Sequence, residues 1–508
     1  MFGVLSDLFT LNTMLALCLG TFGGLIVGAL PGLSATMGMS LLIPITYGME
    51  PTPALIMISA VYVSAVYGGS FSAILIRTPG TPASAATAID GYELTKQGRG
   101  LQAVGVSTTA SVFGGVVSAL ALLCIAPQLV KISLLFSSPE YFLIAIFGLT
   151  IVGSLSGHNM MKGLLAAAFG LLMGMVGMNI FPYSRYSFGN LNLSGGIQLV
   201  PAMIGLFSIS QVLSQAEKVS KVISSREEQE ELKSQIQNAG KMTGRFWPDR
   251  KLFRKLLPTM SRAAVLGIFV GILPGAGGDI GSWVGYNDAK SHSKEKELFG
   301  KGSLEGVAGS EAGNNAVCGG ALIPALTLGI PGSGAAAVLL GALTVQGFAP
   351  GRDLFTTYKG MTYSLLIGFL LANILMGFFG WLLAKRAVKL AALPLGILLP
   401  VILLLSVVGS YAIRNNTFDI YVMLFFGVVG YLMRKVDIPA APAVLALILG
   451  PMAERNLMTS FQMAKVNILV YYMTRPLCWL FLLLIVFSVV SPVVSARKKA
   501  RKNSNSTS

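Results

Sequence analysis

Four Pro-Gly pairs stand in or beside apolar stretches of the chain and offer its clearest candidate chemistry. They are Pro31-Gly32, Pro79-Gly80, Pro274-Gly275 and Pro331-Gly332. Proline removes a backbone donor and ends a helix, while glycine permits a tight turn and the close approach of a ligand. A helix broken in this way offers free N-terminal amides to a carboxylate, and its unwound carbonyls can bind a cation. We therefore interpret the pairs as candidate solute and ion sites.

Small or hydroxyl-bearing residues follow each pair and could cap a half-helix or bind an oxyanion. They are Ser34, Thr36, Thr81, Ser84, Ala276, Gly277 and Ser333. Tight packing between helices would explain any single pair equally well, because small residues let backbones approach closely. Four pairs in two matching sets favour a functional role.

Several polar residues near the turns are further candidates, since ionisable groups inside a membrane are costly and face partners or water. Arg77 precedes the second turn and could hold a carboxylate in a bidentate fork, or it could reach out to the membrane surface. Asn314 and Asn315, with Glu311 one turn earlier, could contact a solute or a cation, or pack between helices. Asp279 is an acidic candidate, whereas we expect Asp90, beside a polar run, to be solvated.

These considerations predict two groups of site residues. We expect the solute site near the membrane midplane, built from Arg77, Thr78, Pro79, Gly80, Thr81, Asn314, Asn315, Pro331, Gly332 and Ser333. We assign ion coupling or helix breaking to Pro31, Gly32, Ser34, Thr36, Pro274, Gly275 and Asp279.

The amino-acid composition indicates that these residues lie on membrane-spanning helices. The 508 residues are 54% hydrophobic and only 11% charged, and the mean hydropathy is +0.71. A soluble domain carries about a quarter charged residues, so a soluble fold is excluded. Long apolar runs predict an all-α polytopic membrane protein with roughly a dozen spans at about 20 residues each.

The basic residues indicate how the chain is oriented. The net charge is +16, but the basic residues concentrate in hydrophilic connectors such as 216–257 and at the C-terminus, rather than forming a basic domain that would bind nucleic acid. Under the positive-inside rule both segments are cytoplasmic, whereas Asp7 is the single charge before the first apolar run. We expect the N-terminus outside and no nucleic-acid partner.

The connector separates two regions that repeat each other. Residues 24–38 read GLIVGALPGLSATMG and residues 267–281 read GIFVGILPGAGGDIG, while residues 67–84 resemble residues 318–336 around the second Pro-Gly pair. If the first repeat begins outside and the second inside, the repeats are inverted, as in many secondary transporters. We divide the chain into 1–215, the connector 216–260, the second repeat 261–392, additional helices 393–494 and the tail 495–508.

Metal and enzyme signatures are missing from the sequence. The four cysteines are widely spaced, and the two histidines, His158 and His292, lie far apart with no ligand pattern. Phosphate-loop, zinc-helix and nucleophile-elbow motifs are also missing. We expect no cofactor or metal and no enzymatic activity, with energy supplied by an ion gradient, Na⁺ or H⁺, or by another subunit.

The motifs GALPGLSATMG, YGGSFSAILIRTPGTPASAATAIDGY and GSEAGNNAVCGGALIPALTLGIPGSGAAAVLLGAL closely resemble the large membrane subunit of the tripartite tricarboxylate transporter family. The similarity covers nearly all of the chain. It implies a bacterial inner-membrane permease that takes up citrate or other organic carboxylates, driven by a cation or proton gradient. It also implies two partners, a small four-helix membrane subunit and a periplasmic solute-binding protein. At Arg77 the family pattern more often carries asparagine, which leaves the substrate open.

Two functions from other classes remain as alternatives. A passive channel needs no coupling ion and no binding protein. A membrane-embedded enzyme acting on lipid would need a nucleophile or a metal cluster. Uptake into vesicles separates the three, because only a secondary transporter concentrates solute when an ion gradient is imposed.

Overall fold

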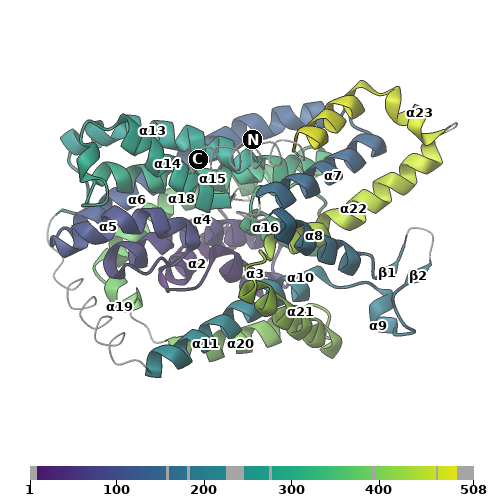
Figure 1. The fold of residues 1–508 in the computed structure, drawn as a ribbon, viewed down its shortest axis with the longest axis horizontal. Helices are drawn as coiled ribbons and strands as arrows, with labels where there is room; N and C mark the ends of the chain where they lie inside the picture. Colours follow the sequence, from purple (N-terminus) through teal and green to yellow (C-terminus); the bar gives the residue numbers. More distant parts are fainter. Residues whose placement is uncertain are drawn as a thin grey trace, which may run out of the picture. The chain divides into compact units, whose positions relative to one another are not determined.

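A computed structural model describes residues 8–155, 160–179, 183–224, 245–273, 277–391, 395–464 and 467–488 of the chain. The described residues are almost entirely helical, and their one sheet is a short antiparallel pair, β1 (Gly177–Met178) with β2 (Ser184–Arg185). The predicted all-α class is confirmed (Figure 1).

The chain divides into two compact units. The boundaries of these units differ from the boundaries of the sequence repeats. Unit 1 comprises Met1–Val130 and Val200–Leu432. Its first-repeat helices are α2 (Leu11–Ala29), α3 (Ala35–Thr46), α4 (Pro51–Ile76), the short turn η1 (Pro82–Ser84), α5 (Ala85–Lys96) and most of α6 (Gly100–Ser133). Its second-repeat helices are α13 (Arg250–Ile272), α14 (Gly277–His292), η3 (Lys296–Leu298), α15 (Leu304–Leu328), α16 (Gly334–Val345), α17 (Arg352–Thr356) and α18 (Lys359–Ala384).

Six further described helical segments belong wholly or partly to unit 1. They are α10 (Leu199–Met203), the π-helical segment η2 (Ile204–Ile209), α11 (Ser210–Ser224), α19 (Ala387–Ala391), α20 (Leu395–Ala412) and α21 (Thr417–Lys435), of which α10 and α21 run across the unit boundary. Both α20 and η2 contact α3.

Unit 2 comprises Lys131–Leu199 and Met433–Ser508. Its described elements are α7 (Ser138–Leu155), α8 (Met160–Gly174), β1, β2, α9 (Leu191–Ser194), α22 (Ala441–Met463) and α23 (Ile468–Met473). Helices α7, α8 and α22 pack together around buried Ala145, Ala167 and Ala446. Small residues at this contact let the three helices approach closely.

Seven described helices are long and apolar enough to cross a membrane, and six shorter apolar helices accompany them. Large apolar side chains on these helices face outward, such as Leu404, which is 63% exposed, and Phe378, which is 52% exposed. Such exposure is expected of side chains that meet lipid. The chain is therefore a multi-pass membrane protein, and the expected dozen spans stays a prediction.

The second Pro-Gly turn of each repeat has the same local geometry. Arg77 follows the last residue of α4 and Gly329 follows the last residue of α15, and both adopt the left-handed conformation, with φ of 54° and 74°. The turn then folds back onto its own helix, since Gly80 N donates to Gly69 O at 3.3 Å. In the second repeat, Gly332 N donates to Ala321 O at 3.4 Å in the same way.

The glycines of these turns pack against backbone. A Cβ at Gly80 would overlap the carbonyl oxygen of Gly28 in α2, and a Cβ at Gly332 would overlap that of Gly271 in α13. The sequence interpretation gave these glycines the role of admitting a ligand. In the structure each glycine packs against the backbone of the neighbouring helix, and a role in admitting a ligand stays a prediction.

Each repeat also places its second turn against the helices of the other repeat. The turn η1 of the first repeat contacts α14 and α15, whereas α16 of the second repeat contacts α3 and α4. Helices α13, α14 and α15 contact one another and are labelled together in Figure 1. The polar residues predicted for the solute site therefore lie where the two repeats meet.

Candidate functional site

The side chain of Asn314 lies at this meeting point of the repeats. It is completely buried in the middle of α15. A Cβ added to Gly278, in the first turn of α14, would lie 2.7 Å from Asn314 Oδ1 and 3.4 Å from the Cβ of Ala83 in η1. The amide thus faces the N-terminal end of α14 and the first repeat's turn together.

Neither Oδ1 nor Nδ2 of Asn314 has a hydrogen-bond partner among the described residues. Leaving a buried polar group without a hydrogen-bond partner costs about 1–3 kcal/mol of folding free energy by mutational data. Its neighbour Asn315 donates through Nδ2 to Glu311 O at 3.2 Å, but its Oδ1 also lacks a partner in this part of the chain. The two adjacent amides therefore keep donors and acceptors available for a polar ligand.

The first turn of α14 lies against both predicted solute-binding turns. Gly277 N donates to Gly332 O of the second turn at 3.3 Å. The next residue, Gly278, lies beside the Asn314 amide and beside Ala83 of η1, which directly follows the first turn. Ser333 and Tyr62 of α4 share a hydrogen bond of 3.0 Å.

The hydroxyl groups of the turns are engaged in local bonds. Thr81 Oγ1 and Ser84 Oγ are 3.0 Å apart, and Ser333 Oγ accepts from Ala336 N at 3.1 Å, capping α16. Thr78 is exposed and bonds to Ile76 O at 3.2 Å. These contacts hold the turns in shape, as N-caps and hydroxyl turns do.

Arg77 lies apart from the buried amides. Its side chain is exposed, and its guanidinium lies 5.8 Å from the centre of the Tyr92 ring. Cation–π contacts of this kind are common for arginine at a surface. The structure therefore places Arg77 with Tyr92, and the proposed pairing with a carboxylate stays a prediction.

The residues assigned to ion coupling or helix breaking fall at the first turn of each repeat. Ser34 Oγ accepts from Met37 N at 3.2 Å and caps α3, and Gly32, with φ of 82°, offers its carbonyl to Gln211 and Gln215 of α11. Pro31 and Thr36 are half-buried beside them, and Asp279 is exposed in the first turn of α14. Pro274, Gly275 and Ala276 lie outside the described residues.

A buried carboxylate, Glu311, lies one turn before Asn314 on α15. Thr87 of α5 donates to its Oε1 at 2.5 Å, and Ser111 of α6 donates to its Oε2 at 2.8 Å. Thr87 Oγ1 also lies 2.9 Å from Ser310 Oγ. The sequence pointed to Glu311 as a neighbour of the asparagines, but Thr87 and Ser111 carry no spacing signal that would have joined them to it.

Asp90 corrects an expectation drawn from the sequence. We expected it to be solvated, but its side chain is completely buried. Its Oδ1 accepts from the backbone amides of Gly300, Gly302 and Ser303 at 2.7–3.0 Å, and its Oδ2 accepts from Tyr286 at 2.9 Å. The polar run after Asp90 suggested a solvated side chain. The loop that buries Asp90 lies before α15, far away in the sequence, so no local pattern indicated this contact. Asp90 holds that loop in place.

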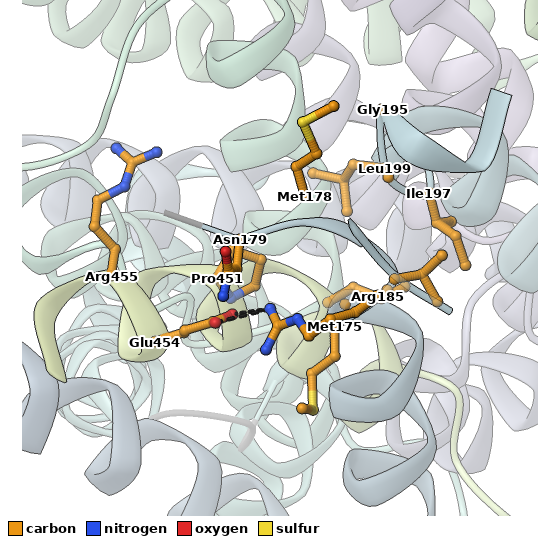
Figure 2. Close-up of a pocket in the computed structure, with 14 residues that line it drawn as sticks. Met175, Met178, Asn179, Arg185, Gly195, Ile197, Leu199, Pro451, Glu454 and Arg455 are labelled. Atoms are coloured by element: carbon orange, nitrogen blue, oxygen red, sulfur yellow. Dashed lines mark hydrogen bonds and ion pairs between the residues drawn. The ribbon is translucent and has the colours of Figure 1, made fainter. Parts of the chain in front are cut away.

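Unit 2 contains a separate hollow of about 330 Å³ beside the β1–β2 hairpin (Figure 2). Arg185 and Glu454 form an ion pair across it at 2.7 Å, with Asn179, Met178 and Arg455 in its lining. None of the residues predicted for the solute site lines this hollow. Among the described residues no group of three or more His, Cys, Asp or Glu could hold a metal ion.

Comparison with known proteins gives a consistent picture. The family described as "Tripartite tricarboxylate transporter TctA family" matches residues 14–445. A protein of Agrobacterium vitis, "Uncharacterized 52.8 kDa protein in TAR-I ttuC' 3'region", is 34% identical over 459 residues, which cover 90% of this chain and 88% of the relative. A second protein of that organism, "Uncharacterized protein in TAR-II ttuC' 3'region", is 34% identical over 211 residues, covering 42% and 87%. No solved structure matches this chain.

Proposed function

Because this chain belongs to the tripartite tricarboxylate transporter TctA family, we propose that it is a permease subunit that takes up small organic carboxylates across a bacterial inner membrane. The uptake is driven by a cation or proton gradient. The family is one of transporters rather than enzymes. Within the proposal, a binding protein outside the membrane delivers the solute, and a small four-helix membrane subunit completes the assembly.

The observation that carries the proposal is the pair of buried amides at Asn314 and Asn315. Asn314 has two donor hydrogens and an acceptor without partners in the described structure, and it faces the N-terminal end of α14. A helix N-terminus attracts a carboxylate through its amides and its dipole. A carboxylate leaving water loses a large hydration energy, which such fixed donors replace.

Contacts between loops support an inverted arrangement of the two repeats. Lys255, within the basic connector, pairs with Glu295 at 2.8 Å, and Gln97 donates to Lys301 O at 2.8 Å. These contacts place the end of α5 and the loops around α13 and α14 on the same side of the membrane as the basic connector. Under the positive-inside rule that side is cytoplasmic. If so, α2 enters the membrane from outside and α13 from inside, and the solute site lies between them near the midplane.

Uptake of labelled citrate tests the proposal. The chain is expressed with a candidate small membrane subunit and binding protein in cells that lack citrate uptake, and accumulation is measured with ion gradients intact or collapsed. We expect accumulation against the gradient only when all three proteins and an ion gradient are present. Equilibration without accumulation would support a passive channel instead. Failure of citrate and of a panel of other carboxylates to enter would refute carboxylate transport, and modification of the lipids would favour the enzyme alternative.

A further inference from the structure

We propose that Glu311 is the residue that binds and releases a coupling proton during transport, an inference that rests on the proposed function. The carboxyl group is fully buried in unit 1. No lysine or arginine among the described residues forms an ion pair with it. An ionised carboxylate in such a place has a high desolvation cost, and proton binding removes it.

The hydroxyl groups around Glu311 permit it to change protonation without leaving an unpaired group. In the described arrangement Thr87 and Ser111 donate one hydrogen bond each to the two carboxylate oxygens. A hydroxyl can both donate and accept. When a proton arrives on Oε1, the carboxylic acid donates to Thr87, and Thr87 turns its own hydrogen to Ser310, 2.9 Å away. One proton is gained, no covalent bond other than O–H changes, and each group keeps a partner.

This geometry favours a proton over a metal cation. Each carboxylate oxygen accepts one O–H···O hydrogen bond, of 2.5 and 2.8 Å, within the usual range for such bonds. A hard metal cation takes about six oxygen ligands, whereas the polar side chains bonded to the carboxylate in the described residues are the hydroxyls of Thr87 and Ser111. The bonds already present therefore fit a proton without any rearrangement of the helices.

Among the described residues, the phenol of Tyr67 on α4 and the thiol of Cys318 on α15 are close enough to interact with Glu311 electrostatically. The phenol of Tyr62 on α4 lies beside Cys318. Another buried carboxylate, Asp90 of α5, has its oxygens occupied by Tyr286 of α14 and three backbone amides. On α13, Arg262 is paired with Asp288 of α14 at 2.9 Å, and Asp279 of α14 is exposed.

The position of Glu311 connects the proton to the solute site. Its carbonyl oxygen accepts from Asn315, and Asn314 follows it by one helical turn. Its hydroxyl partners come from α5 and α6 of the first repeat, whereas Glu311 itself belongs to the second repeat. A change in the protonation of Glu311 therefore alters the hydrogen bonds that join the two repeats beside the proposed solute site. Coupling of proton binding to solute transport requires such a link.

Infrared spectroscopy on the purified full chain in lipid nanodiscs tests proton binding without any substrate. Difference spectra between acidic and alkaline buffer are recorded for the wild type and for Glu311→Gln, and the two are subtracted. We expect one protonated-carboxyl band that is present in the wild type and lost in Glu311→Gln. Thr87→Val keeps the carboxyl group but removes a hydrogen bond, so the band should remain and shift in frequency. Glu454→Gln, in unit 2, serves as the matched control and should leave the band unchanged.

A full band in Glu311→Gln, or no shift in Thr87→Val, would overturn the assignment. Transport gives a second arm, with citrate as the probe. Glu311→Gln should lose accumulation driven by a proton gradient while still exchanging labelled for unlabelled citrate. Equal accumulation by wild type and variant on a sodium gradient would also overturn the inference. If the wild type exchanges no carboxylate, the proposed function fails instead, and the infrared result stands separately.

Discussion

Gly80 lies directly against the carbonyl oxygen of Gly28, so that no side chain fits between the second turn of the first repeat and helix α2. Gly332 and Gly271 repeat this relationship in the second repeat. The two turns are therefore fixed by backbone contact with a neighbouring helix. These backbone contacts therefore also position the polar residues around the turns.

We predict that Gly80→Ala and Gly332→Ala destabilise the protein, since the new methyl group must push two helices apart at a cost of about 1–3 kcal/mol each. Thermal unfolding of the purified chain in detergent measures the effect. Gly23→Ala is the matched control, because a Cβ at this position of α2 meets nothing within 4 Å. Unchanged unfolding temperatures for both turn variants would show that the turns are free to move.

The helical class could be predicted from the sequence, whereas the partners of each residue could not. The solute site inferred from the Pro-Gly pairs stays a prediction. Apolar runs and Pro-Gly pairs are local signals, and the repeat makes them visible twice. The bond from Thr87 to Glu311 joins residues that are 224 positions apart, and hydrophobic periodicity carries no information about such a pair. The contact between Gly80 and α2 could likewise not be predicted, because a glycine beside a ligand and a glycine packed against a helix look identical in sequence.

We predict that Asp90→Ala loosens the loop before α15. The change leaves three backbone amides and the Tyr286 hydroxyl without their acceptor, and each buried donor that stays unpaired costs about 1–3 kcal/mol. Trypsin should then cut more quickly at Lys296 and Lys301. Asp353→Ala, at an exposed position, provides the comparison. Equal cleavage rates in the two variants would contradict a structural role for Asp90.

In unit 2, Arg475→Ala should lower the unfolding temperature. Arg475 donates to the buried Glu140 carboxylate at 2.5 Å, and a hydrogen bond to a charged group contributes roughly 1.5–3 kcal/mol. The double variant with Glu140→Gln should recover part of the loss, because a neutral amide is less costly to leave buried. A double variant less stable than Arg475→Ala would show that Glu140 is stabilised in another way.

Cysteine labelling should reveal opposite sides for two exposed positions of unit 1. We predict that a membrane-impermeant maleimide modifies Thr357→Cys in intact cells, and that Lys301→Cys reacts only after permeabilisation. The reason is that Lys301 lies with the loops on the side of the basic connector, whereas α18 runs from the 357 end toward basic Lys385 and Arg386. Labelling of both positions from outside would contradict the inverted arrangement.

The most direct test of the account is citrate transport by an Asn314→Leu variant, compared with Asn373→Leu. Both asparagines are completely buried in unit 1, but Asn373 lies on α18 against Gly115 and is not assigned to the site. Losing hydrogen bonds to a charged solute costs about 1.5–3 kcal/mol, so we predict roughly a ten- to hundredfold lower uptake efficiency for Asn314→Leu at equal membrane abundance. Asn373→Leu should transport nearly as the wild type does. Unchanged affinity and rate in a stably inserted Asn314→Leu would contradict the placement of the solute site.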